Sequence, residues 1–413
     1  MLPWDEAVSQ GLCRPSFYKS LLYIRLDGIG DNILSAPLLE NMPGVFPNAA
    51  ITVVCDKSAA ALYEHAPMAG KIVPLDKKRL REPEYFREAL ETLRQCRADV
   101  VFSGALSPTA HDCALMLETG LPVISTEVDT SNMPHADKTA FEQKAAVLLP
   151  RRRSARMEVE RHGDILETLG VTGVSLSPKM WLSGEDFRDA EACWKACGFS
   201  PEKTVALFAG GGQPGNRYPW FGEALAGFFA ENGYAVAALG GPGDRKVNDA
   251  VLTAFADRGV PVANLCAEKS LRRDAAFLRD CRLAFGVDTA LAHIACVSGT
   301  PLVTLVSGPF FGRFLPYSSN TTVVCLPLAC YGCRWKCRYE TPHCITGIAP
   351  ETVRQAVEHV LSRPRGSERK TLFMQSPDRW PGREGGPDWQ SPQAFIAAHK
   401  SKKIGGLSVV VGR

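Results

Sequence analysis

The feature that most constrains the fold is a repeated alternation of short apolar segments with longer helical patterns, which begins near residue 20. In the first half of the chain, the apolar segments are residues 21–26, 50–55, 98–102 and 122–124. Short runs rich in apolar and β-branched residues are typical of buried strands. Their alternation with helices predicts the α/β class, with a parallel sheet covered by helices on both faces.

A second series of the same kind follows residue 181. Its apolar segments are residues 204–208, 235–239, 283–285 and 302–306, with helical patterns at 221–232 and 270–280. Because 413 residues exceed what one hydrophobic core organises, we expect two doubly wound domains, residues 1–180 and 181–363.

The composition changes again after residue 363. Arg, Pro, Gly, Ser and Gln are enriched there, so residues 364–413 are predicted to form a loosely structured tail. Residues 407–411 are its one candidate strand.

Charge and cysteine content exclude several classes of protein. With 47 Lys and Arg against 44 Asp and Glu, the net charge of +3 gives no basis for binding nucleic acid by bulk charge. The chain contains no apolar stretch long enough to span a membrane, and its acidic start does not resemble a secretory signal. The 14 cysteines are therefore expected to be thiols or metal ligands in a reducing cytoplasm.

One cluster of basic residues bears on a membrane partner. It contains Arg151, Arg152, Arg153, Arg156 and Arg161. A solvated helix face is the favoured interpretation, and contact with an anionic substrate or a peripheral contact with the inner membrane is the alternative.

Glycines follow the first predicted strand, at residues 25–37. Gly28 and Gly30 permit close backbone approach to a ligand, and ligands collect at the carboxyl ends of parallel strands. Ile33 stands where a dinucleotide-binding fingerprint has its third glycine, which argues against NAD. Asp31 is either the N-cap of the next helix or a general base, and its spacing alone favours the cap.

A second glycine turn follows the segment 204–208. Gly210, Gly211 and Gly212, with Arg217 a few residues later, suit a diphosphate held by backbone N–H groups and one cation. The turn lacks the Gly-Lys-Ser/Thr ending of a P-loop, and a plain flexible loop explains the pattern equally well.

A third candidate segment follows residues 283–285. Asp288 or Thr289 can cap the helix that starts there, and His293 lies one turn further along. A lone histidine near a helix start is more often structural than functional, but a strand end is also where ligands bind.

Five of the 14 cysteines fall within residues 325–344. Four of them, Cys330, Cys333, Cys337 and Cys344, could supply a closed tetrahedral site for a structural Zn or Fe ion. Unliganded thiols and a redox pair of Cys330 and Cys333 are the alternatives. Cys325 belongs to the preceding apolar segment.

Together, three motifs resemble those of the family 9 glycosyltransferases, the bacterial heptosyltransferases and their relatives. They are R-x-x-x-x-G-D-x-x-x-x-x-P from Arg25, G-N-R-Y-P from Gly215 and G-V-D-T-x-x-x-H from Gly286. The resemblance runs from about residue 20 to residue 362. It implies a GT-B fold, in which two Rossmann-like domains face each other across a cleft. The first domain would receive the acceptor, and the second would bind the nucleotide sugar.

The resemblance also implies roles for single residues. Asp31 matches the catalytic aspartate of the family, which replaces the N-cap interpretation. Arg217 stands where the family usually has a phosphate-binding lysine, and Ala290 replaces a usual glycine. The implied nucleotide-sugar-binding residues are Gly30, Gly211, Gly212, Arg217, Asp288, Thr289, Ala290 and His293.

The implied function is inverting transfer of a heptose or related sugar from an ADP-activated donor to a lipopolysaccharide-core or other glycan hydroxyl, with no cofactor in the chemistry. The cysteine segment resembles the iron-binding finger of the autotransporter heptosyltransferases, so a protein acceptor is the alternative. A catalytically silent GT-B binding protein is the third interpretation.

Overall fold

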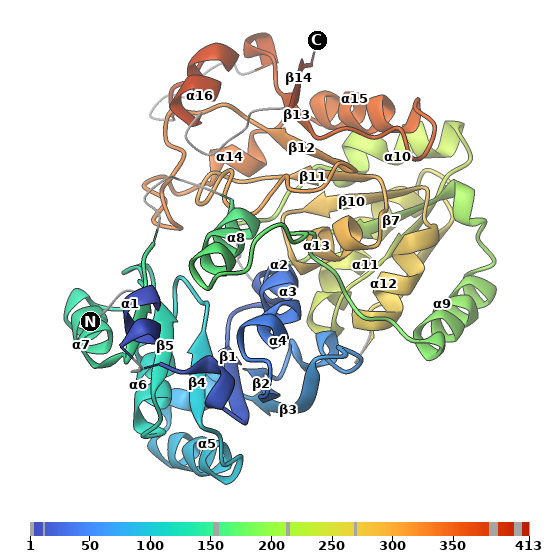
Figure 1. Ribbon diagram of the computed structural model, residues 1–413. Coiled ribbons are helices and arrows are strands. Elements are labelled where there is room, and N and C mark those ends of the chain that lie inside the picture. Colours follow the sequence, from blue (N-terminus) through green and yellow to red (C-terminus); the bar gives the residue numbers. More distant parts are fainter. Residues whose placement is uncertain are drawn as a thin grey trace. The chain divides into compact units, whose positions relative to one another are not determined.

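The computed structural model describes residues 4–10, 13–151, 157–211, 215–267, 271–379, 387–399 and 407–412 (Figure 1). The chain divides into two compact units. The first comprises Met1–Arg153 and Glu158–Trp181, and the second comprises Ser154–Met157 and Leu182–Arg413.

A six-stranded parallel sheet forms the centre of the first unit, in the order β3-β2-β1-β4-β5-β6. This is the Rossmann order, which reverses direction between β1 and β4. The strands are β1 (Ser20–Arg25), β2 (Ala50–Asp56), β3 (Ala69–Leu75), β4 (Val100–Ser103), β5 (Val123–Thr126) and β6 (Val147–Leu149). The helices are α1 (Trp4–Ser9), α2 (Ile29–Leu34), α3 (Ala36–Glu40), α4 (Met42–Val45), α5 (Pro83–Gln95), α6 (Ala110–Glu118), α7 (His135–Lys144) and α8 (Glu158–Thr168).

The second unit contains an eight-stranded parallel sheet, in the order β14-β13-β12-β11-β10-β7-β8-β9. Its direction of winding reverses between β7 and β10. The strands are β7 (Thr204–Phe208), β8 (Ala235–Ala238), β9 (Val262–Asn264), β10 (Leu283–Val287), β11 (Leu302–Leu305), β12 (Thr321–Cys325), β13 (Thr371–Met374) and β14 (Ser408–Val411). The helices are α9 (Gly184–Cys197), α10 (Phe221–Glu231), α11 (Arg245–Ala256), α12 (Leu271–Asp280), α13 (Ala290–Val297), α14 (His343–Thr346), α15 (Pro350–Leu361) and α16 (Pro392–His399).

Both faces of the second sheet are covered, as the apolar character of its strands predicts. Figure 1 shows α10 and α15 on one side and α9 and α12 on the other. The ring of Trp194 on α9 stacks on Phe277 of α12, with 3.9 Å between the ring centroids. The predicted α/β class with two doubly wound halves is confirmed.

The prediction of a loosely structured tail is wrong for the described part of residues 364–413. Strand β13 pairs with β12, and β14 pairs with β13, so this segment extends the sheet by two strands. Farther along, Leu328 and Trp389 form an antiparallel bridge, and the backbone N–H of Ala329 donates to the carbonyl of Asp388. Within the described residues, no helix has the length and apolar character needed to cross a membrane.

Candidate functional site: two strand-end turns and a cysteine pocket

The first candidate region is the turn between β1 and α2. Helix α2 begins at Ile29, and its N-cap is Gly28, which makes no side-chain capping bond. Asp31 therefore lies within the first turn of the helix, so the interpretation of Asp31 as the N-cap is wrong. Asp31 is half-buried. It follows the carboxyl end of β1, where the strand order of the sheet reverses. Gly30 is the residue before it on the same turn.

Asn32 fixes the shape of this turn. Its side-chain amide donates to the carbonyls of Asp27 and Gly28, at 2.8 Å each. Its Oδ1 accepts a hydrogen bond from the hydroxyl of Tyr63, at 2.5 Å. Because Asn32 is 1% exposed, these bonds hold the backbone beside Asp31 in one conformation.

A buried arginine lies directly before the turn. Arg25, at the end of β1, is 1% exposed, and its guanidinium lies 3.4 Å from the carboxylate of Asp27 and 3.6 Å from that of Glu158. It also donates to the carbonyl of Gly104 at 3.3 Å. Burial would lower the pKa of Arg25, but the nearby carboxylates, led by that of Asp27, outweigh this effect and raise it.

Lys77 adds a second cation to this cluster. Its Nζ lies 3.0 Å from the carboxylate of Asp112 and 3.9 Å from that of Asp27. Burial opposes the charge of Lys77, yet the charges of Asp112, Asp27 and Asp31 raise its pKa. Asp31 also contributes to the raised pKa of Arg25. Both cations are thus within electrostatic reach of the predicted catalytic carboxylate. Arg25 stands in the same motif as Asp31, whereas no motif contains Lys77.

His162 on α8 completes the cluster. Its Nδ1 donates to the carbonyl of Leu34 at 2.9 Å, so its Nε2 is the acceptor facing Nη1 of Arg25 at 3.1 Å. Burial and the charge of Arg25 lower the pKa of His162 to about 3. The imidazole is therefore neutral and orients the guanidinium.

Two members of the predicted basic cluster line a small cavity in the first unit. Arg151 and Arg161 lie there with Glu158, and the cavity has a volume of about 30 Å³. Arg161 is 4.0 Å from the carboxylate of Glu158, so part of its charge is neutralised. Residues 152, 153 and 156 lie outside the described residues.

The second candidate region is the glycine turn after β7. A Cβ added to Gly211 would lie 3.1 Å from the side chain of Thr289, so this turn packs against the start of α13. A Cβ on Gly210 would lie 2.2 Å from the carboxylate of Asp244, which a bond from the N–H of Gly241 holds in place. The predicted residue Gly212 lies outside the described residues.

The start of α13 brings together three other predicted residues. Thr289 is the N-cap, Ala290 is the first helical residue and His293 is one turn further along. The hydroxyl of Thr289 and the Nδ1 of His293 are buried, and neither bonds to any described residue. The ring of Tyr317 stacks on that of His293 at an interplanar angle of 7°. Buried polar atoms are rarely left unpaired, so this helix start is suited to a polar ligand.

Asp288 lies directly before this helix, with its carboxylate 3.9 Å from Nε2 of His293. Desolvation raises the pKa of Asp288 to about 7 and lowers that of His293 to about 4. The carbonyl of Asp288 accepts a bond from the side chain of Asn216 at 2.8 Å, and Oδ1 of Asn216 is itself buried without a bond to a described residue. Asn216 was not among the predicted residues, although it stands inside the G-N-R-Y-P motif. Its neighbour Arg217 is exposed and forms no ion pair with the described residues.

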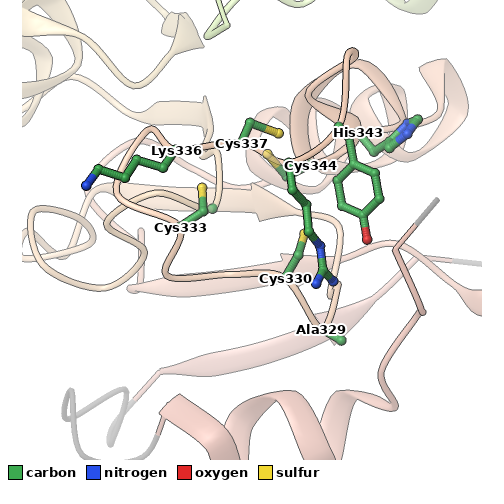
Figure 2. A pocket seen from close by; sticks show the side chains of 10 residues that line it. Ala329, Cys330, Cys333, Lys336, Cys337, His343 and Cys344 are labelled. Atoms are coloured by element: carbon green, nitrogen blue, oxygen red, sulfur yellow. The ribbon is translucent and has the colours of Figure 1, made fainter. Parts of the chain in front are cut away.

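The third region is the cysteine finger, residues 325–345. Cys325 ends β12 and is fully buried, as predicted. The other four cysteines line one cavity of about 250 Å³, shared with Lys336, Arg338, Tyr339 and His343. Figure 2 shows them around this cavity, with the ammonium end of Lys336 extending away from the sulfur atoms.

These four thiols lie close enough to influence one another. Burial, together with the other three cysteines, raises the pKa of Cys344 to about 12. Yet the described residues contain no group of three or more His, Cys, Asp or Glu arranged to hold a metal ion. The predicted donors therefore share a cavity without forming a closed ligand set.

Comparisons with known proteins point to one family. The profile of glycosyltransferase family 9 (heptosyltransferase) matches residues 133–343, about half of the chain. Lipopolysaccharide heptosyltransferase 2 of Salmonella typhimurium is 23% identical over 317 residues, covering 73% of this chain and 86% of that protein.

Solved structures share the fold. A family 9 glycosyltransferase from Veillonella parvula has a TM-score of 0.70 at 22% identity, covering 83% of this chain and 97% of its own. The E. coli ADP-heptose lipopolysaccharide heptosyltransferase II has a TM-score of 0.62 at 19% identity, covering 83% and 98%. The iron-containing dodecameric glycosyltransferase TibC of E. coli has a TM-score of 0.51 at 13% identity, covering 84% and 79%.

Proposed function

Because the chain belongs to glycosyltransferase family 9, we propose that it transfers a heptose or related sugar from an ADP-activated donor to a hydroxyl of a lipopolysaccharide-core or other glycan acceptor. The name of the Salmonella typhimurium relative supports the acceptor class, and that of the E. coli enzyme supports the donor class. The chain is a glycosyltransferase. The identities of the sugar, the nucleotide and the acceptor are what we propose.

The main support for the proposed donor site is the group of unpaired polar atoms around the start of α13. The hydroxyl of Thr289 and the Nδ1 of His293 can donate hydrogen bonds, and Oδ1 of Asn216 can accept one. A sugar nucleotide satisfies all three, because its diphosphate offers acceptors and its hydroxyls offer donors. Gly211 and the first N–H groups of α13 lie beside the same atoms.

The proposed reaction is a single displacement. The acceptor oxygen forms a bond to the anomeric carbon as the bond from that carbon to the diphosphate oxygen breaks, and the electron pair leaves with the nucleoside diphosphate. Arg217 and the positive end of the α13 dipole stabilise the charge that develops there. Asp31 takes the proton of the acceptor hydroxyl, and attack from the opposite side inverts the anomeric centre.

Thermal unfolding of the purified chain with ADP-, UDP- and GDP-sugars tests the donor. A ligand that binds only the folded state, at a hundredfold excess over its Kd, raises the Tm by on the order of 5 °C. We expect this shift with ADP-heptose. A shift with a UDP- or GDP-sugar alone would overturn the nucleotide assignment, and a shift without any transfer would favour a silent binding protein.

A second candidate is transfer to a protein acceptor, with the cysteine finger carrying a structural metal. The observation in its favour is that Cys330, Cys333, Cys337 and Cys344 line one cavity. Because the described thiols do not form a closed ligand set, we propose that they draw together as thiolates around one Zn or Fe ion, which would rigidify the finger and take no part in the displacement. Metal analysis should find about one equivalent, and less than about a tenth of an equivalent rejects the site.

We also propose that the reaction takes place in the cytoplasm. All 14 cysteines are unpaired in the structure, which supports a reducing cytoplasm as the place of the reaction. Fractionation of cells that express a tagged form of the chain would test this location.

A further inference from the structure

The tip of the cysteine finger, residues 333–336, is a tight turn with an unusual backbone. The N–H of Lys336 donates to the carbonyl of Cys333 at 2.9 Å. Both central residues have left-handed backbones, with φ of 51° at Arg334 and 64° at Trp335. Such positions normally hold Gly, Asn or Asp, and a bulky residue is disfavoured at each. Backbone strain of this kind persists mainly where the residues have a function.

The exposure and charge of the side chains on this turn indicate a recognition surface. Arg334, Trp335 and Lys336 are exposed, and 42% of the surface of Trp335 is accessible. Neither cation forms an ion pair with the described residues. Glu340 is the only acidic residue in 331–340, so the tip has a positive charge.

A second group of the same chemistry lies beside the tip. The N–H groups of Gly332 and Arg334 donate to the carbonyls of Gly308 and Pro309, which joins the finger to the loop that follows β11. On that loop, the guanidinium of Arg313 lies over the rings of Phe310 and Phe314, 5.6 and 4.7 Å from their centroids. Both phenylalanines are half-buried. Aromatic and cationic side chains thus continue from the tip onto this loop.

We propose that the finger tip and the adjoining Phe310–Phe314 loop dock the enzyme on an anionic phospholipid surface. Indole rings favour the boundary between water and lipid, where the ring contacts acyl chains and its N–H remains hydrated. Arg334 and Lys336 flank Trp335, so they reach the headgroup phosphates as the ring enters the boundary. The proposal does not depend on which sugar is transferred.

A nucleic acid fits this surface less well than a membrane does. Strands of DNA or RNA are bound along extended basic tracks. Here Arg334 and Lys336 share one four-residue turn, the adjoining loop adds only Arg313, and the net charge of the chain is only +3. An exposed turn with one tryptophan and two cations instead suits a shallow interfacial anchor.

Vesicle sedimentation with the purified full chain tests the proposal. Vesicles contain phosphatidylcholine alone or mixed with phosphatidylglycerol. We expect binding to the mixed vesicles that weakens with added salt. The double variant Arg334→Ser/Lys336→Ser should bind about 30-fold more weakly. A matched control, Lys246→Ser/Arg258→Ser, removes two exposed cations elsewhere and should change binding by less than about twofold.

A second measurement reports on the ring itself. Brominated lipid should quench the fluorescence of the wild-type protein, and the Trp335→Phe variant should lose that quenching while binding with nearly unchanged affinity. Equal binding to neutral and anionic vesicles, or equal loss in the two double variants, would overturn the proposal. A double variant that keeps vesicle binding but loses transfer to a soluble acceptor would also overturn it, because the tip would then contact the acceptor. Nucleotide-sugar binding is measured separately, so failure of the membrane proposal leaves the proposed function standing.

Discussion

The Nε2 atom of His293 lies 3.9 Å from Oδ1 of Asp288, and burial moves the pKa of the two groups in opposite directions. With its pKa lowered to about 4, His293 is neutral at pH 7. The pKa of Asp288 is raised to about 7, so its carboxyl is present in both forms. The start of α13, where we propose that the donor diphosphate binds, therefore carries only a partial negative charge from this pair.

Donor affinity should consequently depend on the protonation of Asp288. As the pH rises from about 6 to about 8, the carboxylate becomes fully charged and repels the diphosphate, so the Kd of an ADP-sugar should rise by up to roughly tenfold. In Asp288→Asn this dependence should disappear. Calorimetric titration across the pH range measures both, with the exposed Asp257→Asn as control. A wild-type Kd that does not change with pH, or an unchanged slope in Asp288→Asn, contradicts the explanation.

Replacement of Asp31 should separate donor binding from transfer. In Asp31→Asn the amide cannot take the proton of the acceptor hydroxyl, so kcat should fall by about 10²–10⁴-fold. Thermal stabilisation by the donor should remain, because Asp31 belongs to the first unit, whereas the unpaired polar atoms of the proposed donor site at the start of α13 belong to the second. Radiolabelled sugar transfer measures the first effect and thermal unfolding the second.

The exposed Asp137→Asn is the matched control for this variant, since it removes a carboxylate of the same unit on α7. It should transfer sugar at the wild-type rate. If Asp31→Asn also does so, Asp31 is not the general base.

The structure shows why the sequence predicted the fold better than the details of the site. Strands such as β1 and β7 are continuous apolar runs, and their bounds differ from the predicted ones by at most one residue. Strand β13 was missed because its four residues stand in a segment rich in Arg, Pro and Gly. Its formation depends on pairing with β12, which local composition does not reveal.

The same limit applies to the site. The motifs placed Thr289 and His293 correctly at the start of one helix, because that relationship spans only a few residues. By contrast, the contacting residues His162 and Arg25 are 137 positions apart in the sequence. Asn216 and Asp288, which are hydrogen-bonded, are 72 positions apart. Such pairs depend on how the strands are ordered in the sheet, so a single sequence gives no local signal for them.

Gly286 should be essential for the second sheet. A Cβ at this position of β10 would lie 2.2 Å from the carbonyl oxygen of Phe208 on β7, and neither strand can move without disturbing the centre of the sheet. We expect Gly286→Ala to lower the free energy of unfolding by about 3 kcal/mol. Urea denaturation of the full chain measures this.

Gly227 on α10 provides the control for this substitution, since an added Cβ there meets nothing within 4 Å. Gly227→Ala should stabilise the protein by about 1 kcal/mol through helix propensity. Equal effects of the two substitutions would mean that the strands β7 and β10 adapt to the added methyl group.

His162 should make the first unit sensitive to acid. Its folded pKa of about 3 lies below the usual 6.5, so between these values the unfolded chain binds more protons than the folded one. Stability therefore falls as the pH drops from about 6.5 towards 3, by up to about 4 kcal/mol from this group. In His162→Gln, which retains an acceptor for Arg25, that contribution should vanish and the dependence on pH should flatten. Urea denaturation at several pH values measures the slopes, with the exposed His111→Gln as control. If the slopes of His162→Gln and wild type coincide, His162 is not the group that titrates on unfolding.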